Sequence, residues 1–356
     1  MDDLLGDMLF EILHKLPIES ILTCRAVCKT WKDHIRDPWF IEEVGNSCHQ
    51  SMRLILKSLP GSHLTLLDIE GCRTRQIPID EMLEVLQIMC TCDGLLCMAS
   101  ALNLDPVVIY NPITRERVIL PSSSSSEQPI SSHEVGIGFD PSSNKYKVVR
   151  AYTISEGRVK RFEIISLGER SWRRLNAPEG IVDCDGSGVV FYKDALYWTM
   201  NGGHSTLIVQ FNLSHETFHM VSFPDYFPSD HASLGLIEVG GCLTLVENTG
   251  SVIKLWRLTT ANATGDNPYF SLLDTYDMHV NWGRSSCEFV CALNQESYLL
   301  QVGFRNSRDR RQEYLTRYSP EEIQYSNLGI HGLPPSFKIV CFKPSLRPLP
   351  AASSVA

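Results

Sequence analysis

The sequence predicts a small all-α N-terminal module followed by an all-β, propeller-like domain. Apolar residues recur at helical spacing only as far as Phe40. A strand–turn–strand–proline pattern then repeats along the chain at nearly constant steps. The length of 356 residues is enough for one small and one large domain.

The first helix is predicted from a single apolar stripe. Leu9, Ile12, Leu13 and Leu16 stand at i, i+3, i+4 and i+7, and Pro17 then ends the helix because its ring removes a backbone donor. A further helical hairpin of similar apolar content follows as far as residue 36. So much apolar surface on so short a segment predicts a docking module, because segments of this size rarely fold alone. The alternative is an ordinary core hairpin at the start of a domain.

Four ordered sub-motifs in this region resemble the F-box, the helical motif that tethers a substrate receptor to the Skp-type adaptor of a cullin–RING ubiquitin ligase. They lie at residues 4–13, 16–21, 27–31 and 37–40. Two positions depart from the family pattern, since Leu5 stands at the usual first proline and Glu19 replaces a usual basic residue. We expect both to lie on or near the surface that meets the adaptor.

The resemblance implies an adaptor-binding site on this module. Part of the matching set is expected to pack inside the module instead, and both roles stay open for each residue at this point. The residues expected to form the site are Leu4, Leu5, Leu9, Ile12, Leu16, Pro17, Ser20, Ile21, Leu22, Val27, Cys28, Lys29 and Trp31.

Strand signals replace the helical period after the module. Short β-type runs at 52–57 and 63–69 are separated by Pro60 and Gly61, and Asp80 is expected to cap a helix reaching Ile88. We therefore divide the chain into a helical module at 1–43, connecting strands and a helix at 44–90, the β domain at 91–346 and a flexible tail at 347–356.

The repeat has three full copies, at 107–121, 162–178 and 208–224, and weaker copies at 252–258 and 314–320. Each full copy reads as a hairpin closed by proline. Taking Asn111, Ser166, Asn212 and Arg257 as equivalent gives steps of 55, 46 and 45 residues, which suit four-stranded propeller blades. Six blades are predicted, although five or seven also fit, and a two-sheet sandwich is the rival arrangement. Residues 337–342 are expected to join the early strands and close the ring.

This second region resembles the F-box-associated domain of plant F-box proteins, which is related to kelch-type propellers. The resemblance covers about residues 90 to 340. The resemblance rests on the sequence motifs at residues 92–97, 110–115, 136–149, 171–174 and 196–198.

No catalytic constellation is found, and no metal or cofactor is expected. Gly136 and Gly138 begin like a dinucleotide fingerprint, but a strand follows where a helix is needed. His215 and His219 are four apart in a hairpin turn, where that spacing gives no shared helical face. Gly186 and Gly188 are expected to serve a turn with positive φ.

The composition indicates which classes of partner and which cellular compartment to expect. The net charge of −9 argues against nucleic-acid and membrane partners, which need a basic surface. The N-terminus lacks a signal-peptide pattern, and no apolar run is long enough to span a membrane. The twelve cysteines lack metal-site spacing and are expected to remain thiols in a cytoplasmic or nuclear protein.

The two resemblances together imply a non-catalytic substrate-recognition subunit of a Skp–cullin–F-box ubiquitin ligase. The helical module would bind a Skp-family adaptor and, through it, cullin and the RING protein. The β domain would bind an unidentified target protein, with loops at 180–188, 201–205, 224–231 and 261–268 as candidates for recognition. The alternatives are a propeller binding protein, lectin-like or sequestering, that acts outside a ubiquitin ligase, and an enzyme on a propeller scaffold.

Overall fold

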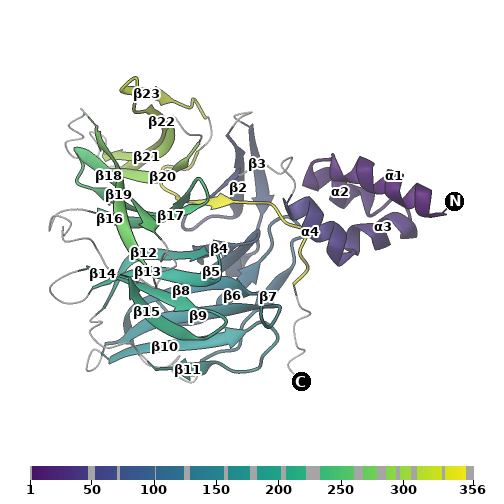
Figure 1. Cartoon of the computed structure of the whole chain (residues 1–356), viewed down its shortest axis with the longest axis horizontal. Helices are drawn as coiled ribbons and strands as arrows, with labels where there is room; N and C mark the ends of the chain where they lie inside the picture. The colour runs from purple at the N-terminus through teal and green to yellow at the C-terminus, as the bar shows by residue number, and fades with distance from the viewer. Residues whose placement is uncertain are drawn as a thin grey trace.

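The structure is a computed structural model, and its architecture is four N-terminal helices beside a ring of β-sheets (Figure 1). It describes residues 2–46, 53–69, 73–100, 102–123, 129–155, 159–176, 183–201, 206–221, 233–259, 268–278, 286–293, 297–305, 311–330 and 333–349. No helix in these ranges is long and apolar enough to cross a lipid bilayer.

The N-terminal module is made of short helices whose ends are set by proline and aspartate. Its helices are α1 (Asp2–His14), α2 (Ile18–Cys24), α3 (Lys29–Arg36) and α4 (Pro38–Asn46). Pro17 is the N-cap residue of α2, as its fixed φ of −57° favours. Asp37 caps α4 by accepting hydrogen bonds from the backbone amides of Trp39 and Phe40. Pro38 holds the first helical position, where a missing amide proton costs nothing.

The strands of the described residues form six four-stranded antiparallel sheets, which confirms the six predicted blades. Blade 1 has the order β24-β1-β2-β3, and its strands are β1 (Arg53–Lys57), β2 (His63–Asp68), β3 (Arg73–Pro78) and β24 (Lys338–Phe342). Blade 2 follows a short helix, α5 (Glu81–Glu84), and contains β4 (Gln87–Cys92), β5 (Leu95–Ala99), β6 (Val107–Tyr110) and β7 (Arg117–Ile119).

The remaining blades follow in chain order. Blade 3 contains β8 (Ile130–Asp140), β9 (Lys145–Ile154), β10 (Val159–Ser166) and β11 (Arg173–Leu175). Blade 4 contains β12 (Asp183–Tyr192), β13 (Ala195–Asn201), β14 (Thr206–Asn212) and β15 (Thr217–Val221). Blade 5 contains β16 (Ser233–Val239), β17 (Cys242–Asn248), β18 (Val252–Thr259) and β19 (Tyr269–Asp277). Blade 6 contains β20 (Ser286–Ala292), β21 (Tyr298–Arg305), β22 (Arg311–Ser319) and β23 (Gln324–Asn327).

The ring is closed by its last strand. β24 pairs with β1 in antiparallel register, with Leu54 opposite Cys341 and Ile55 opposite Val340. The expected pairing of residues 337–342 with the early strands is therefore observed. It also places β1, β2 and β3 inside the ring, whereas the sequence division assigned them to a connecting segment. The pairing joins the two ends of the described β-structure within one blade, so that β1 is covered by a neighbouring strand on both sides.

Two local expectations are corrected. The helix expected from Asp80 to Ile88 is only the four-residue α5, because Gln87 already begins a strand that pairs with β5. The Asp80 cap itself is present, with the carboxylate accepting from the Leu83 amide at 3.2 Å. The tail assigned from 347 is held at its start, since the Leu349 amide donates to the Glu116 carboxylate at 3.2 Å.

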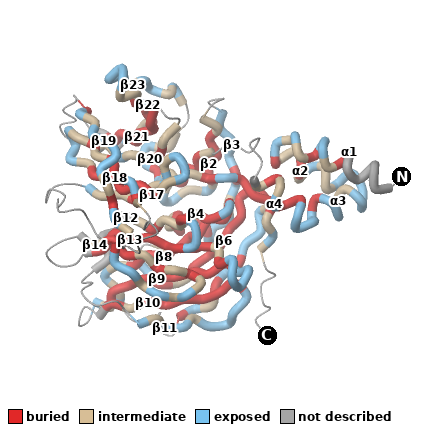
Figure 2. The backbone as a smooth tube through the Cα atoms, viewed as in Figure 1, coloured by how far each residue is buried: buried red, intermediate tan, exposed pale blue. Residues whose placement is uncertain are grey.

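The repeated phrases correspond to the third and fourth strands of successive blades. Asn111 directly follows β6, while Ser166 and Asn212 end β10 and β14. Arg257 lies two residues before the end of β18, so its equivalence is approximate. Figure 2 shows buried positions continuing from the ring into the helical module. One apolar cluster accordingly contains both helical and blade residues.

Candidate functional site

The predicted adaptor-binding residues differ in burial, since some lie in the core and others are exposed on the helices. Leu9 and Ile21 are buried in the core of the module, so neither offers apolar surface to a partner. Ile12 and Val27 are 54% and 62% exposed. Pro17, Cys28 and Lys29 are exposed, and Leu16, Ser20, Leu22 and Trp31 are half-buried. Leu4 and Leu5 lie in α1, but their side chains are outside the described residues.

Two further exposed apolar residues were missed by the sequence reasoning. Met8 is 60% exposed and lies one helical turn before Ile12, so the two share one flank of α1. Trp39 is 59% exposed, and its ring stacks on Phe10 with centroids 4.7 Å apart. The helical spacing of positions 8 and 12 was the available signal for Met8. Trp39 follows Pro38 inside the fourth sub-motif, so the sequence places it in the module but does not indicate that its side chain is exposed.

This exposed apolar surface is what a protein partner would cover. Burying a large apolar side chain contributes about 1.5–3 kcal/mol, so a side chain that is already half covered offers about 1 kcal/mol. Four such residues therefore supply several kcal/mol before the costs of association are subtracted. Their chemistry fits protein docking.

Glu19 does not lie where the sequence analysis expected it. Instead of facing a free surface, its carboxylate pairs with the Arg53 guanidinium on β1, through Nη1 to Oε1 and through Nη2 to Oε2 at 3.4 Å. Arg75 Nη1 on β3 lies 3.8 Å from the same Oε1. The departure from the family pattern at this position therefore serves a contact between α2 and blade 1.

The seam between the helices and the ring is apolar around this ion pair. Ile18 and Ile21 of α2 belong to the same buried cluster as Ile77 of β3 and Ile113 of the β6–β7 turn. A cavity of about 250 Å³ opens at the seam, and Glu19, Leu22, Arg75 and Arg115 are among the residues that line it. The helices thus rest on the outer part of blades 1 and 2.

A larger cavity of about 1050 Å³ runs between the innermost strands. All of its described lining residues belong to the β domain, so the helices leave the channel uncovered. The charged residues that line it carry both signs and are Asp93, Lys193, Glu238, Glu288, Lys338 and Lys343. Most of the loops proposed for target recognition lie outside the described residues.

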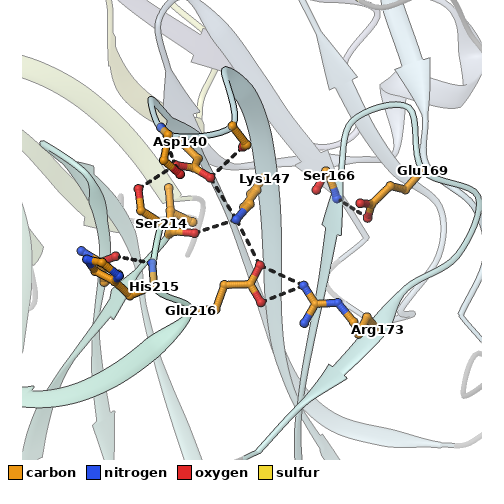
Figure 3. Close-up of polar contacts among 12 residues, drawn as sticks. Asp140, Lys147, Ser166, Glu169, Arg173, Ser214, His215 and Glu216 are labelled. Carbon is orange, nitrogen blue, oxygen red and sulfur yellow. Dashed lines mark hydrogen bonds and ion pairs between the residues drawn. The ribbon is translucent and has the colours of Figure 1, made fainter.

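Asp140 and Lys147, from the sequence motif at 136–149, form a polar network between blades 3 and 4 (Figure 3). The Asp140 carboxylate is fully buried and lies 3.0 Å from Lys147 Nζ. It also accepts hydrogen bonds from the hydroxyls of Ser142, Ser143 and Ser214, at 2.7, 2.7 and 2.6 Å. Burial opposes ionisation of Asp140, but these donors outweigh it and hold its pKa well below the usual range.

The network continues outward through Glu216. Lys147 Nζ lies 3.0 Å from Glu216 Oε1 and donates to the Leu213 carbonyl at 2.7 Å. Arg173 Nη2 donates to both Glu216 oxygens, at 2.9 and 2.7 Å. Burial raises the pKa of Glu216, and the hydrogen bonds from Arg173 and Lys147 lower it by more. Since these groups satisfy one another, the network reads as a structural clamp between blades.

The 171–174 motif also has a structural role. Arg150 is fully buried, and its Nη2 and Nε donate to Glu163 Oε2 at 2.7 and 2.9 Å. Its guanidinium carbon lies 3.9 Å from the ring centroid of Trp172. Trp172 Nε1 in turn donates to the Pro121 carbonyl at 2.6 Å. The tryptophan therefore covers a buried ion pair.

The glycines of the apparent dinucleotide fingerprint serve close packing. A Cβ on Gly136 would lie 2.4 Å from Val189 Cγ1, and one on Gly138 would lie 2.5 Å from Phe191 Cδ2. Blade 4 therefore approaches blade 3 more closely than any other residue would allow. Gly188 has a φ of +92°, as the sequence predicted, but it lies at a bulge within β12 and not in the turn that was expected.

The histidines and cysteines take separate local roles. The His215 amide donates to Asn212 Oδ1 at 2.8 Å, and His219 Nε2 lies 3.1 Å from Thr217 Oγ1. No group of three or more possible metal ligands occurs among the described residues. The nine cysteines whose side chains the structure describes are free thiols. Burial raises the pKa of Cys90 to about 11, so this thiol behaves as a core side chain.

Comparisons with known families match both parts of the chain. Residues 2–43 match the F-box domain, and residues 71–314 match the F-box associated beta propeller domain. The second match alone spans more than half of the chain.

Relatives named as F-box proteins occur in Arabidopsis thaliana. One F-box protein is 25% identical over 274 residues, which cover 71% of this chain and 74% of the relative. An F-box/LRR-repeat protein is 26% identical over 385 residues, covering 99% of this chain and 84% of the relative. An F-box/LRR-repeat/kelch-repeat protein is 29% identical, covering 67% and 65%.

Solved structures resemble the chain only distantly. The catalytic domain of a Coprinopsis cinerea GH62 α-L-arabinofuranosidase has a TM-score of 0.36 and 12% identity, covering 60% of this chain and 72% of that one. Prolyl oligopeptidase B from Galerina marginata has a TM-score of 0.38 and 12% identity, covering 78% and 40%. At such TM-scores the likeness carries no argument about this chain.

Proposed function

This chain belongs to the F-box proteins that carry an F-box-associated β-propeller domain, and we propose that it is the substrate-recognition subunit of a Skp–cullin–F-box ubiquitin ligase. In this role the helical module binds a Skp-family adaptor and, through it, cullin and the RING protein. The propeller binds a target protein. The relatives named as F-box proteins support the proposal at the level of the family.

The observation that carries the proposal is the exposed apolar surface of the helical module. Met8, Ile12, Val27 and Trp39 are each more than half exposed, although the same helices bury other apolar side chains in a cluster shared with the ring. Exposed apolar side chains concentrated on one small module favour a protein partner. Among the predicted adaptor contacts, Ile12 and Val27 are exposed large apolar side chains.

The subunit itself is proposed to be non-catalytic. Ubiquitin transfer would be accelerated because the assembled ligase holds a charged conjugating enzyme beside a lysine of the bound target, so that an encounter in solution becomes a local one. The channel and the loops around its mouths are the proposed target surface, since the helices leave the channel open. The proposed compartment is the cytoplasm, the nucleus or both.

The proposal is tested by charging the exposed apolar surface. We expect Ile12→Asp combined with Val27→Asp to weaken adaptor binding by at least about 100-fold, because each change removes about 1 kcal/mol of burial and adds a carboxylate to desolvate. Isothermal titration calorimetry of the full chain with a purified plant Skp-type adaptor gives the dissociation constant.

Leu102→Asp is the matched control. Leu102 is 80% exposed and lies between β5 and β6 of the propeller, so the same chemical change there should leave adaptor affinity unaltered. An equal loss in both variants, or none in either, would reject the assignment of this surface. Failure of the wild-type chain to bind any Skp-type adaptor would instead favour a propeller binding protein acting outside a ligase.

A further inference from the structure

The contact between α2 and blade 1 joins the two parts of the chain by more than the backbone. Glu19 meets the Arg53 guanidinium through two oxygens, and Arg75 Nη1, on the outermost strand of the same sheet, lies 3.8 Å from Oε1. Planar, two-point pairing of this kind fixes orientation as well as distance. Glu19 and Arg53 are only 22% and 16% exposed at their side chains, so solvent screens the pair less than it screens a surface ion pair.

Apolar packing surrounds the pair on the same seam. Ile18 and Ile21 of α2 and Phe40 of α4 share one buried cluster with Ile77 of β3 and Phe342 of β24. Packed side chains resist sliding because each has only a few allowed positions. The helices and blade 1 thus share one continuous apolar core.

The charge arrangement makes Glu19 specific to this seam. Without its carboxylate, Arg53 and Arg75 would face each other, and Arg115 lines the same small cavity. The basic residue that F-boxes usually carry at this position would add another positive charge to that group. Neighbouring like charges repel one another, and the repulsion is stronger for partly buried groups than for groups in water.

We propose that Glu19 is a positioning residue, which locks the F-box and the propeller into one rigid body through Arg53 and Arg75. The lock fixes the direction in which a bound target faces the adaptor and the conjugating enzyme beyond it. This consequence for ubiquitin transfer rests on the proposed function, whereas the rigid body itself does not.

The experiment measures the distance distribution across the seam in the full chain. Donor and acceptor dyes are attached through genetically encoded azido residues at Asp33 and Lys193, which are both exposed and lie in α3 and in the β12–β13 turn. Single-molecule energy transfer should give one narrow distribution for the wild-type protein. Glu19→Lys should raise the share of molecules outside that peak by about tenfold, the factor expected for losing a partly buried pair and adding repulsion.

Two more variants separate the lock from a general loss of stability. Glu19→Gln removes the attraction without adding a charge and should give an intermediate width. Combining Glu19→Lys with Arg53→Glu reverses the pair and should restore the narrow peak. A Glu19→Lys distribution as narrow as that of the wild type, or a reversed pair as broad as the single variant, would overturn the lock.

Adaptor affinity is measured on the same variants with the purified Skp-type adaptor. We expect it to be unchanged, because Glu19 faces the propeller. Loss of adaptor binding in Glu19→Lys with an unchanged distance distribution would place Glu19 on the adaptor surface and refute the positioning role. Absence of adaptor binding by every form, the wild type included, would refute the proposed function while the distance data still decide the rigid body.

Discussion

Asp140→Ala tests whether the buried network between blades 3 and 4 is a structural clamp. Asp140 is fully buried and accepts three serine hydroxyls and the Ser142 amide. It also neutralises Lys147, which is only 9% exposed at its side chain. Removing one partner of a buried pair costs about 3–5 kcal/mol, because the other charge stays buried. Lys147 keeps Glu216 as a second partner, which places the expected loss near the lower end.

The assay is urea denaturation of the full chain, followed by tryptophan fluorescence and by circular dichroism. The matched control is Asp194→Ala, since Asp194 is an exposed turn residue that accepts one hydrogen bond, from Asn212. We expect this control to lose about 1 kcal/mol or less. A loss below about 1 kcal/mol for Asp140→Ala as well would refute the reasoning, because a clamp of this kind cannot be that weak.

The same variant predicts a pH dependence with a defined sign. The pKa of Asp140 is lower in the folded protein than in the unfolded chain, so its contribution is present above the unfolded pKa, which is about 4. The difference between wild type and variant should therefore stay constant from about pH 8 to pH 5 and shrink only as the pH falls below about 4. A difference that grows on acidification would contradict the assigned charge state.

Two further predictions concern packing and thiol access. Gly138→Ala should lower the free energy of unfolding in denaturation experiments by about 1–3 kcal/mol, because its new methyl group would lie 2.5 Å from Phe191. The control Gly235→Ala would have no atom within 4 Å of its methyl group and should be nearly neutral. Equal effects of the two changes would contradict the close contact between the blades. In native protein, iodoacetamide followed by mass spectrometry should modify exposed Cys28 but not buried Cys90, whose pKa is about 11. Adding the Skp-type adaptor should then protect Cys28, and rapid modification of Cys28 in the complex would exclude it from the interface.

The blade count was predictable from sequence because each blade repeats one hairpin. The turn after the third strand needs a polar residue that can bond the backbone, as Asn111 does when it accepts from the amides of Ile113 and Thr114. Asn212 plays the same part for His215. Such local chemistry leaves a regular mark on the sequence. Ring closure was also predictable, since an unpaired inner strand at either end would be costly.

Contacts between distant segments were not predictable in the same way. Glu19 looked like a weakened partner contact because its arginine partners lie on β1 and β3, and nothing in the local sequence connects them. The helical pattern likewise does not show that Ile21 is buried and Ile12 is exposed. Both are apolar on amphipathic helices, and only the packing of α2 against the ring buries the first and leaves the second half exposed.

One part of the domain division differs from the structure, namely the placement of the strands of blade 1. The strands at 53–78 precede the first full repeat, so the sequence assigned them to a connection. Their blade is completed by β24, from nearly 300 residues later in the chain. The pairing of residues 337–342 with these strands was expected, but blade 1 lacks a copy of the repeat that marks the other blades, so its strands were not counted as a blade.

The most direct test of the central claim is a calorimetric titration of the unmodified chain with a plant Skp-type adaptor. The account predicts saturable one-to-one binding at micromolar affinity or tighter, with a negative heat-capacity change from buried apolar surface. A flat titration with a folded protein and an adaptor that binds another F-box would contradict it.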